Sequence, residues 1–167
     1  MQIRRRNLFF ISSALFLYGL ISFQIPIRAQ MFGGTSGLSA FSIPQTNLIQ
    51  PDALNQLLQG KAAARPTILQ VGSHMMYSEA HIPGSIYAGP GAESAGLDLL
   101  ASKVAKLKKT DSIVIYCGCC PWGHCPNVGP AFKKLHDMGF THVKVLYLAN
   151  NFGDDWVNRG YRVEQGQ

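Results

Sequence analysis

The sequence predicts an α/β domain built around a mainly parallel sheet. Three observations support this fold class: short apolar runs alternate with segments of helical periodicity, proline and glycine separate the two kinds of segment, and 47% of the 167 residues are hydrophobic. Strands separated by helices of this length pair in parallel, because each helix carries the chain back to the edge where the preceding strand began. A chain of this length is expected to form one domain.

The first half of the domain contains three predicted strands and one predicted helix. An extended segment at 47–50 precedes a helix that opens at Pro51, carries leucine and alanine on one face, and stops at Gly60. The run TILQV at 67–71 lies between proline and glycine, which predicts a short buried strand. Another short strand, at 85–88, follows a Pro-Gly turn.

The second half continues the alternation. Leucine and valine recur at helical spacing over 97–107, and lysines near the end of this segment suit the negative end of the helix dipole. The run SIVIY at 112–116 is predicted to be an interior strand. A helix through 131–138 ends at a glycine, a strand follows at 143–148, and a short helix at 154–159 also ends at a glycine.

Residues 1–29 are predicted to be a signal peptide. Arginines at 4–6 precede an uncharged apolar run at 8–23, and an Ile-Arg-Ala stretch then supplies a small residue for cleavage. The apolar run has 16 residues, whereas a membrane-spanning helix needs about 20, so the length favours a signal peptide. A retained membrane anchor is the alternative interpretation. Glycine and serine are common in 30–43, which predicts a flexible linker and leaves 44–167 as the domain.

The charge of the chain argues against nucleic-acid binding. The formal net charge is +6, from 15 basic and 9 acidic residues, but four arginines lie in the predicted signal peptide and leave 11 basic residues elsewhere. A nearly neutral domain lacks the basic face of a nucleic-acid binder.

Because of the predicted signal peptide, we expect an exported protein, periplasmic or secreted. We expect it to be a monomer that meets a membrane only through an uncleaved signal segment.

All four cysteines lie within nine residues, in the segment CGCCPWGHCPN at 117–127. This segment follows the strand at 112–116 and precedes a helix, so it lies at the carboxyl edge of the sheet, where open parallel sheets hold their sites. A helix N-terminus lowers the pKa of a nearby thiol, and the thiolate is the reactive form. The position predicts a reactive centre; the alternative is a loop closed by local disulfides for stability alone.

Three groups of residues resemble the rhodanese-like sulfurtransferase family. The segment ILQVGSHMMYSEAHIPGS at 68–85 is similar to the first family signature, which ends in G-H-I-P-G-A, and Cys117 stands where the family has its nucleophile. The tail NNFGDDWVNRGYRV at 150–163 is similar to the closing pattern G-G-F-x-x-W-x-x-x-G-Y-P-V. The likeness spans about 46–163 and implies a rhodanese-like fold, with a mainly parallel five-stranded sheet flanked by helices on both faces.

The resemblance also implies a function and a site. Cys117, as a thiolate open to small molecules, would take sulfane sulfur from a small donor, hold it as a persulfide and pass it to a thiol acceptor, with no cofactor and no metal. Cys119, Cys120 and Cys125 are candidate relay or resolving thiols. The predicted substrate-binding loop contains Gly118, Trp122, Gly123 and His124.

The sequence departs from the family pattern near this site. Gln70 stands where the family usually has aspartate, and Gly72 stands where it usually has arginine. The cysteine loop is longer than usual and contains no arginine or lysine, and its prolines lack amide hydrogens. An anion cradle for thiosulfate is therefore expected to be weaker than in the family at large.

Two other chemistries fit the same cysteines. Cys117 and Cys120 form a C-x-x-C pair, and Cys119 and Cys120 are adjacent, so a thiol-disulfide redox or thiol-switch function is the alternative. Thiolate metal binding, with His124 as a further ligand, is less favoured because zinc sites usually gather ligand pairs from two loops. A binding module without activity is the remaining interpretation.

Several polar and aromatic residues outside this chemistry have structural interpretations. His81 is predicted to be a turn histidine and Trp156 a core residue. Asn127 and the pair at 154–155 are predicted to cap helices.

Overall fold

The computed structural model describes residues 43–62 and 65–166. The predicted signal peptide and the predicted linker up to residue 42 lie outside the described residues. Ile43 is buried in the core of the domain, at the point where the linker was expected to end. Within the described part of the chain, none of the helices has both the length and the apolar character needed to cross a membrane.

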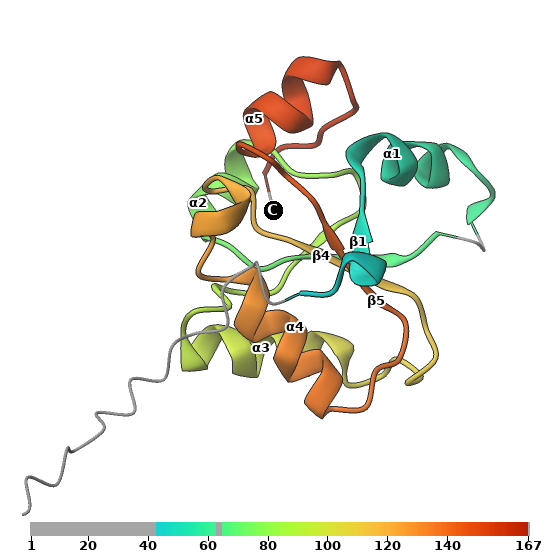
Figure 1. Ribbon diagram of the computed structural model, residues 1–167, viewed down its shortest axis with the longest axis vertical. Helices are drawn as coiled ribbons and strands as arrows, with labels where there is room; N and C mark the ends of the chain where they lie inside the picture. Colours follow the sequence, from blue (N-terminus) through green and yellow to red (C-terminus); the bar gives the residue numbers. More distant parts are fainter. Residues whose placement is uncertain (1–42, 63–64, 167) are drawn as a thin grey trace, which may run out of the picture. The chain divides into compact units, whose positions relative to one another are not determined.

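The domain is built on one five-stranded sheet in which every pairing is parallel (Figure 1). The strand order is β1-β5-β4-β2-β3, so β4, the strand that precedes the predicted site, is the central strand of the sheet. This sheet confirms the predicted fold class, and each strand lies inside a predicted segment. The strands are β1 (Leu48–Ile49), β2 (Thr67–Gln70), β3 (Ile86–Tyr87), β4 (Ile113–Tyr116) and β5 (Val143–Leu146).

Among the described residues, four α-helices connect consecutive strands and a fifth follows β5, and short 3₁₀ turns also occur. The helices are α1 (Pro51–Gln59), α2 (His74–Glu79), α3 (Ser94–Val104), α4 (Val128–Asp137) and α5 (Phe152–Asp155). The 3₁₀ turns are η2 (Gln45–Asn47), η4 (Trp122–His124) and η5 (Val157–Arg159).

Two helices differ from the prediction. Helix α2 was not predicted; it begins because the Ser73 hydroxyl accepts a hydrogen bond from the Met76 amide at 3.4 Å. The last predicted helix, at 154–159, is instead the short helix α5 followed by η5. Its N-cap residue is Asn151, rather than Asp154, and the Asn151 Oδ1 accepts from the Asp154 amide at 2.8 Å. The predicted acidic pair lies in the first turn of α5, where the Asp155 carboxylate accepts from the Asn151 amide at 3.2 Å.

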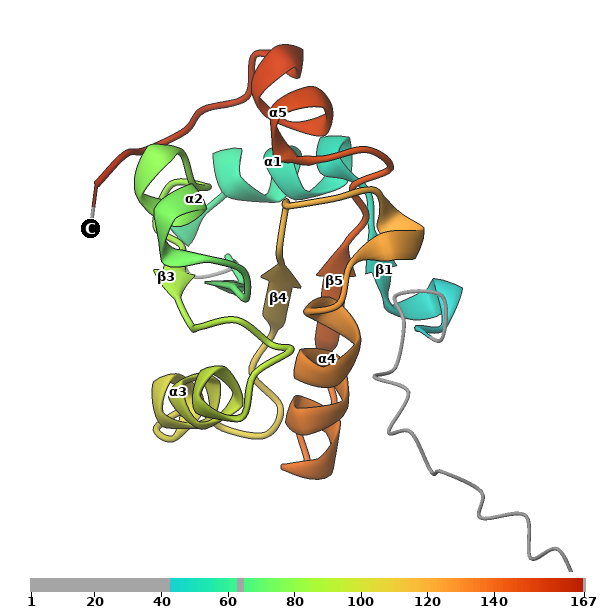
Figure 2. The ribbon, with the colours of Figure 1, turned by 90° about the vertical axis from the view of Figure 1, so that its left-hand side faces the viewer.

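Helices cover both faces of the sheet (Figure 2). Side chains alternate between the two faces along each strand, so Ile113 and Ile115 pack toward α3 and α4, whereas Val114 and Tyr116 pack toward α1 and α5. Trp156 is 1% exposed in the second of these cores, as predicted. Burying side chains of this size stabilises the fold by about 1.5–3 kcal/mol each, which holds the carboxyl end of β4 in place.

The predicted turn histidine has a structural environment. His81 is buried, its Nδ1 donates to the Tyr77 carbonyl at 2.7 Å, and its ring stacks on Tyr77 with centroids 4.0 Å apart. The Ile82 amide next to it donates to the Tyr116 hydroxyl at 3.1 Å. These contacts tie the His-Ile-Pro-Gly segment to β4.

Candidate active site at the carboxyl edge of the sheet

The cysteine loop begins where β4 ends. Cys117 directly follows Tyr116, and the next residue, Gly118, has a positive φ of 86° that turns the chain away from the strand. The Gly118 carbonyl accepts from the Phe152 amide at 3.1 Å, and a Cβ at position 118 would lie 2.7 Å from the Cβ of Phe152. Glycine is therefore required where the loop is held against α5.

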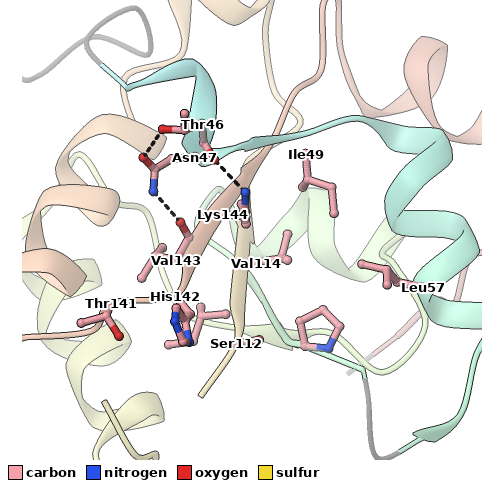
Figure 3. Close-up of a pocket in the computed structure, with 12 residues that line it drawn as sticks. Thr46, Asn47, Ile49, Leu57, Ser112, Val114, Thr141, His142, Val143 and Lys144 are labelled. Atoms are coloured by element: carbon pink, nitrogen blue, oxygen red, sulfur yellow. Dashed lines mark hydrogen bonds between the residues drawn. The ribbon is translucent and has the colours of Figure 1, made fainter. Parts of the chain in front are cut away.

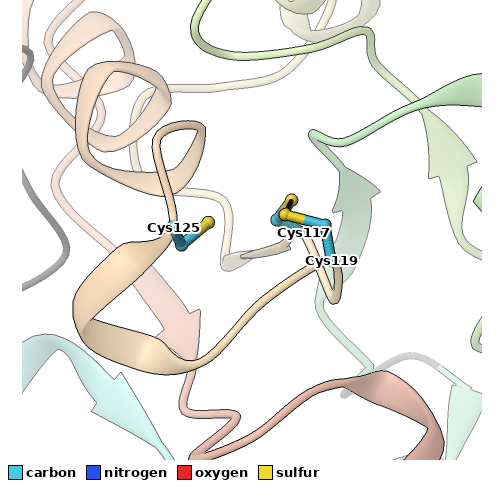
Figure 4. A group of neighbouring side chains, drawn as sticks. All are labelled: Cys117, Cys119 and Cys125. Carbon is cyan, nitrogen blue, oxygen red and sulfur yellow. Dashed lines mark hydrogen bonds between the residues drawn. The ribbon is translucent and has the colours of Figure 1, made fainter.

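The loop brings the predicted thiols together (Figure 4). The Cys117 thiol donates to the Cys119 sulfur at 3.2 Å, and the sulfur atoms of Cys119 and Cys120 are 2.8 Å apart. Cys125 points toward them from the far side of the loop, and the sulfur atoms of Cys117, Cys119 and Cys125 all lie within 4.8 Å of one another. None of the four cysteines forms a disulfide, and Cys119 is the exposed member of the group.

Asn127 connects this cluster to the rest of the fold. Its Nδ2 donates to the Cys117 sulfur at 3.2 Å, and its Oδ1 accepts from the Ala92 amide at 3.0 Å. Asn127 is the N-cap residue of α4, as predicted, but its side chain makes no capping bond to the helix and contacts the cysteines instead. It is the only amide side chain in the loop, and a carboxamide both donates and accepts; this was the available signal for its role.

The two departures from the family pattern lie against Cys117. The Gln70 Nε2 donates to the Cys117 carbonyl at 3.3 Å, while its Oε1 is buried with no hydrogen-bond partner among the described residues. A Cβ at Gly72 would lie 3.0 Å from the Cys117 sulfur and 2.7 Å from the Gln70 Nε2. Cys117 therefore lies against the neutral amide of Gln70, and its sulfur lies beside the space that the missing side chain of Gly72 leaves free.

We expected the Cys117 sulfur to be open to small molecules, but the structure places it in a buried position. Cys117 is 3% exposed, and the cavity beside it, called here the Cys117 cavity, has a volume of about 10 Å³. Such a volume holds about one atom the size of a water oxygen. The residues that line it are Cys117, Gly118, Cys120, Trp122, Cys125, Val128, Leu146 and Leu148.

The electrostatics of the cluster favour an anion on Cys119. Hydrogen bonds from the thiols of Cys117 and Cys125 lower the pKa of Cys119, against an opposing contribution from burial. The same hydrogen bonds hold the proton on Cys117, and burial adds to this, so the pKa of Cys117 is raised. The predicted lowering of the Cys117 pKa by the helix N-terminus is not found, because the amides at the start of α4 face Cys125 instead.

The other predicted loop residues have different surroundings. The Trp122 amide donates to the Ala149 carbonyl at 3.2 Å, and the Trp122 ring lies 5.1 Å from that of Tyr147, which anchors the loop beside β5. The His124 carbonyl accepts from the Cys120 thiol at 3.5 Å, but its exposed imidazole is not part of the cysteine group. Gly123 lies between these two residues in η4.

The thiols alone determine what the cluster could bind or react with. Three sulfur atoms at this spacing suit a thiophilic ion such as zinc or copper(I), and they also suit exchange with a sulfur compound.

A family model and several solved structures are similar to this chain. The model described as a rhodanese-like domain matches residues 50–149. A rhodanese-like domain from Anabaena sp., solved by solution NMR, is 23% identical with a TM-score of 0.52 and covers 71% of this chain and 79% of that one. A protein from Bacillus halodurans is 24% identical with a TM-score of 0.55 and covers 71% of this chain and 76% of that one.

A part of a longer enzyme has the same architecture. The anaerobic ergothioneine biosynthesis enzyme from Chlorobium limicola, solved with its natural substrate trimethyl histidine, is 21% identical with a TM-score of 0.52. The match covers 71% of this chain but 28% of the enzyme, and at such identities it shows the fold alone. A comparison with curated proteins found no match.

Proposed function

The chain belongs to the rhodanese-like domain family, and from this premise we propose that it is a sulfurtransferase that carries sulfane sulfur as a persulfide on Cys117. The observation that carries the proposal is the placement of that residue. Cys117 ends the buried strand β4 at the carboxyl edge of the sheet, beside a cavity of about one atom. The Cys117 cavity suits the outer sulfur of a persulfide and is too small for a whole donor.

The neighbouring thiol supplies the base for this reaction. Cys117 is the hydrogen-bond donor and Cys119 the acceptor, so the Cys117 proton passes to Cys119 as the Cys117 sulfur attacks the donor. Cys119 is exposed and lies 3.2 Å away, so rotation of its side chain admits the donor to Cys117. The Asn127 Nδ2, at 3.2 Å from the same sulfur, stabilises the anion that forms.

The donor is one whose charge needs little neutralisation by the loop. The segment 117–127 contains no arginine or lysine, so a thiosulfonate or an organic persulfide fits the site better than thiosulfate does. In the transfer step, the Cys117 thiolate bonds to the sulfane sulfur, and the donor's sulfinate or thiolate leaves with the electron pair of the broken bond.

Release of the donor's leaving group tests this function. Reduced protein mixed with a benzenethiosulfonate is expected to release one equivalent of sulfinate per chain, and Cys117→Ser is expected to release none. Lys144→Ala, an exposed residue on β5, serves as the control and is expected to match the unsubstituted protein. Sulfinate release from Cys117→Ser at the unsubstituted rate would contradict the assignment of Cys117.

A thiol-disulfide redox function is the second candidate. The sulfur spacings of 2.8 Å and 3.2 Å favour it, because disulfide exchange requires little more than side-chain rotation at such distances. Reduction of a dithiol-disulfide couple by the protein without any sulfane donor would favour this candidate over sulfur transfer. Elemental analysis of the purified protein tests metal binding by the same thiols.

We also propose that the protein is exported and that it is a monomer. The basic and apolar pattern of residues 1–29 supports it. The intact mass of the protein recovered from outside the cytoplasm reports cleavage after residue 29, and its sedimentation reports the oligomeric state.

A further inference from the structure

We propose that Cys119 resolves the Cys117 persulfide within the cluster, so that the sulfur leaves as sulfide and a Cys117–Cys119 disulfide remains. The inference rests on the proposed function, because it begins from a persulfide on Cys117. It adds an activity, the reduction of sulfane sulfur to sulfide at the expense of two protein thiols. The observations behind it are the depth of the Cys117 cavity, the position of Cys119 and the donor-acceptor order of their hydrogen bond.

An acceptor thiol from solution has poor access to the outer sulfur of a Cys117 persulfide. Cys117 is 3% exposed, and the Cys117 cavity holds about one atom, so an outer sulfur would fill it. The walls around that sulfur include the apolar side chains of Val128, Leu146 and Leu148. A second thiol from solution reaches that sulfur only after the Cys119 side chain rotates away, whereas Cys119 itself is already in contact with Cys117.

An acceptor thiol within the protein, that of Cys119, already lies beside Cys117. The Cys119 sulfur is 3.2 Å from the Cys117 sulfur, the distance at which a thiolate can begin to attack. Cys119 is exposed, so rotation of its side chain brings its sulfur in line with the bond between Cys117 and the departing sulfur, as displacement at sulfur requires.

The bonds, protons and electrons balance in this step. The Cys119 sulfur, which received the Cys117 proton in the transfer step, forms a bond to the Cys117 sulfur, and the bond from Cys117 to the outer sulfur breaks. The outer sulfur takes both electrons of that bond and the proton of Cys119 and leaves as hydrosulfide. Two thiols are oxidised to a disulfide while one sulfane sulfur is reduced to sulfide. A dithiol reductant must then reduce the disulfide before another turnover.

Cys119 is better placed for this attack than the other two thiols. Cys120 and Cys125 both line the Cys117 cavity, which the outer sulfur would fill, whereas Cys119 does not line it. Cys119 is also the exposed member of the cluster, so the resulting disulfide is accessible to a reductant from solution. The sulfur atoms of Cys119 and Cys120 are 2.8 Å apart, so these two residues could form a competing disulfide. The experiment must distinguish that bond from the Cys117–Cys119 disulfide.

The experiment is a single turnover of the reduced protein with one equivalent of benzenethiosulfonate. This donor leaves as a sulfinate and brings no thiol of its own, so any sulfide requires protein thiols. The unsubstituted protein is expected to release sulfide and to end about 2 Da lighter, as a disulfide. Cys119→Ser lacks the base for sulfur transfer, so it is expected to release sulfinate more slowly than the unsubstituted protein. Once sulfinate is released, the variant is expected to have gained about 32 Da as a stable persulfide and to release sulfide at least about 100-fold more slowly than it forms that persulfide, because the resolving thiol has been lost.

Two further measurements complete the test. Cyanide should convert the Cys119→Ser adduct to thiocyanate, which shows that the persulfide is intact and that the variant is folded. Cys120→Ser should still release sulfide and form the disulfide, which excludes a Cys119–Cys120 bond as the product.

The outcomes separate the two proposals. If no protein releases sulfinate, the proposed function fails and the inference fails with it. If the unsubstituted protein releases sulfinate but keeps the additional sulfur without forming sulfide, sulfur transfer stands and the resolving role of Cys119 is overturned. Sulfide release from Cys119→Ser at the unsubstituted rate would overturn it as well.

Discussion

The two edges of the sheet differ in space and in chemistry. Beside the amino ends of β4 and β5 lies a cavity of about 590 Å³, whereas the Cys117 cavity at the carboxyl edge measures about 10 Å³ (Figure 3). In the large cavity two polar side chains are already paired: Lys144 Nζ donates to the Thr46 carbonyl at 2.7 Å, and Asn47 Nδ2 donates to the Val143 carbonyl at 3.0 Å. At the carboxyl edge four cysteines meet, and hydrogen bonds from Cys117 and Cys125 lower the pKa of one of them, Cys119.

The difference teaches that volume alone does not locate the centre proposed for this protein. The large cavity is lined by no cysteine, so it offers no thiol nucleophile. A small cavity with close thiols has a nucleophile, a proton acceptor and room for one transferred atom. This follows from topology, since the loops that leave parallel strands at their carboxyl ends gather at one edge.

The largest expected effect tests whether the carboxyl edge holds an anion. The pKa of Cys119 is lowered, so its thiolate persists as the pH falls. Alkylation of Cys119 by iodoacetamide should therefore stay nearly constant from about pH 8 to pH 5, whereas an ordinary thiol slows by about 1,000-fold over that range. Peptide mass spectrometry measures the rate, with denatured protein as the control. A tenfold loss per pH unit in the folded protein would contradict the assigned anion.

A smaller effect compares Gly118, which lies just after β4, with Gly139, which lies just after α4. Gly118 has a φ of 86° and touches Phe152, whereas Gly139 has a φ of 87° and has nothing within 4 Å of an added Cβ. Gly139→Ala should lower the free energy of unfolding by about 1 kcal/mol, from backbone strain alone. Gly118→Ala should lower it by about 3 kcal/mol, because the new Cβ also overlaps Phe152.

Urea denaturation of both variants measures these free energies. Equal losses for the two glycines would show that the contact between the loop and α5 adds nothing, and that the carboxyl edge is no more tightly built than the end of α4 near residue 139.

The smallest effect concerns the hydrogen bond to the reactive sulfur. Asn127→Ala removes the donor at 3.2 Å from Cys117 and should slow sulfinate release by about tenfold, which corresponds to one buried hydrogen bond. Asn127→Asp keeps an acceptor for the Ala92 amide but places a negative charge beside the thiols, and should be slower still. Lys144→Ala, in the large cavity, should have no effect on the rate. A rate for Asn127→Ala equal to that of Lys144→Ala would remove Asn127 from the reaction.

The fold could be predicted because its information is local. The strand at 112–116 is an uninterrupted apolar run, and the helix at 131–138 repeats apolar residues at helical spacing, so each indicates its structure without knowledge of the other. Helix α2 escaped prediction because its six residues include one buried side chain, that of Tyr77, and so carry too short a pattern. Its start depends on the Ser73 hydroxyl.

The site could be predicted only in part. Four cysteines within nine residues must lie near one another in any fold, and their place after a buried strand puts them at the carboxyl edge. The role of Asn127 depends on Ala92, which is 35 residues away and is brought close only by the packing of the loop before α3 against the cysteine loop. Such a contact leaves no periodic signal in the sequence.

By itself, the sequence determined the order of strands and helices, the clustering of the thiols and the family to which the chain belongs, because periodicity, spacing and motifs are properties of neighbouring residues. Only the tertiary structure decided which sulfur is exposed, which one keeps its proton and how much room remains beside Cys117. Those properties depend on burial and on hydrogen bonds between distant segments, and both arise only when the loop packs against α4, α5 and the end of the sheet.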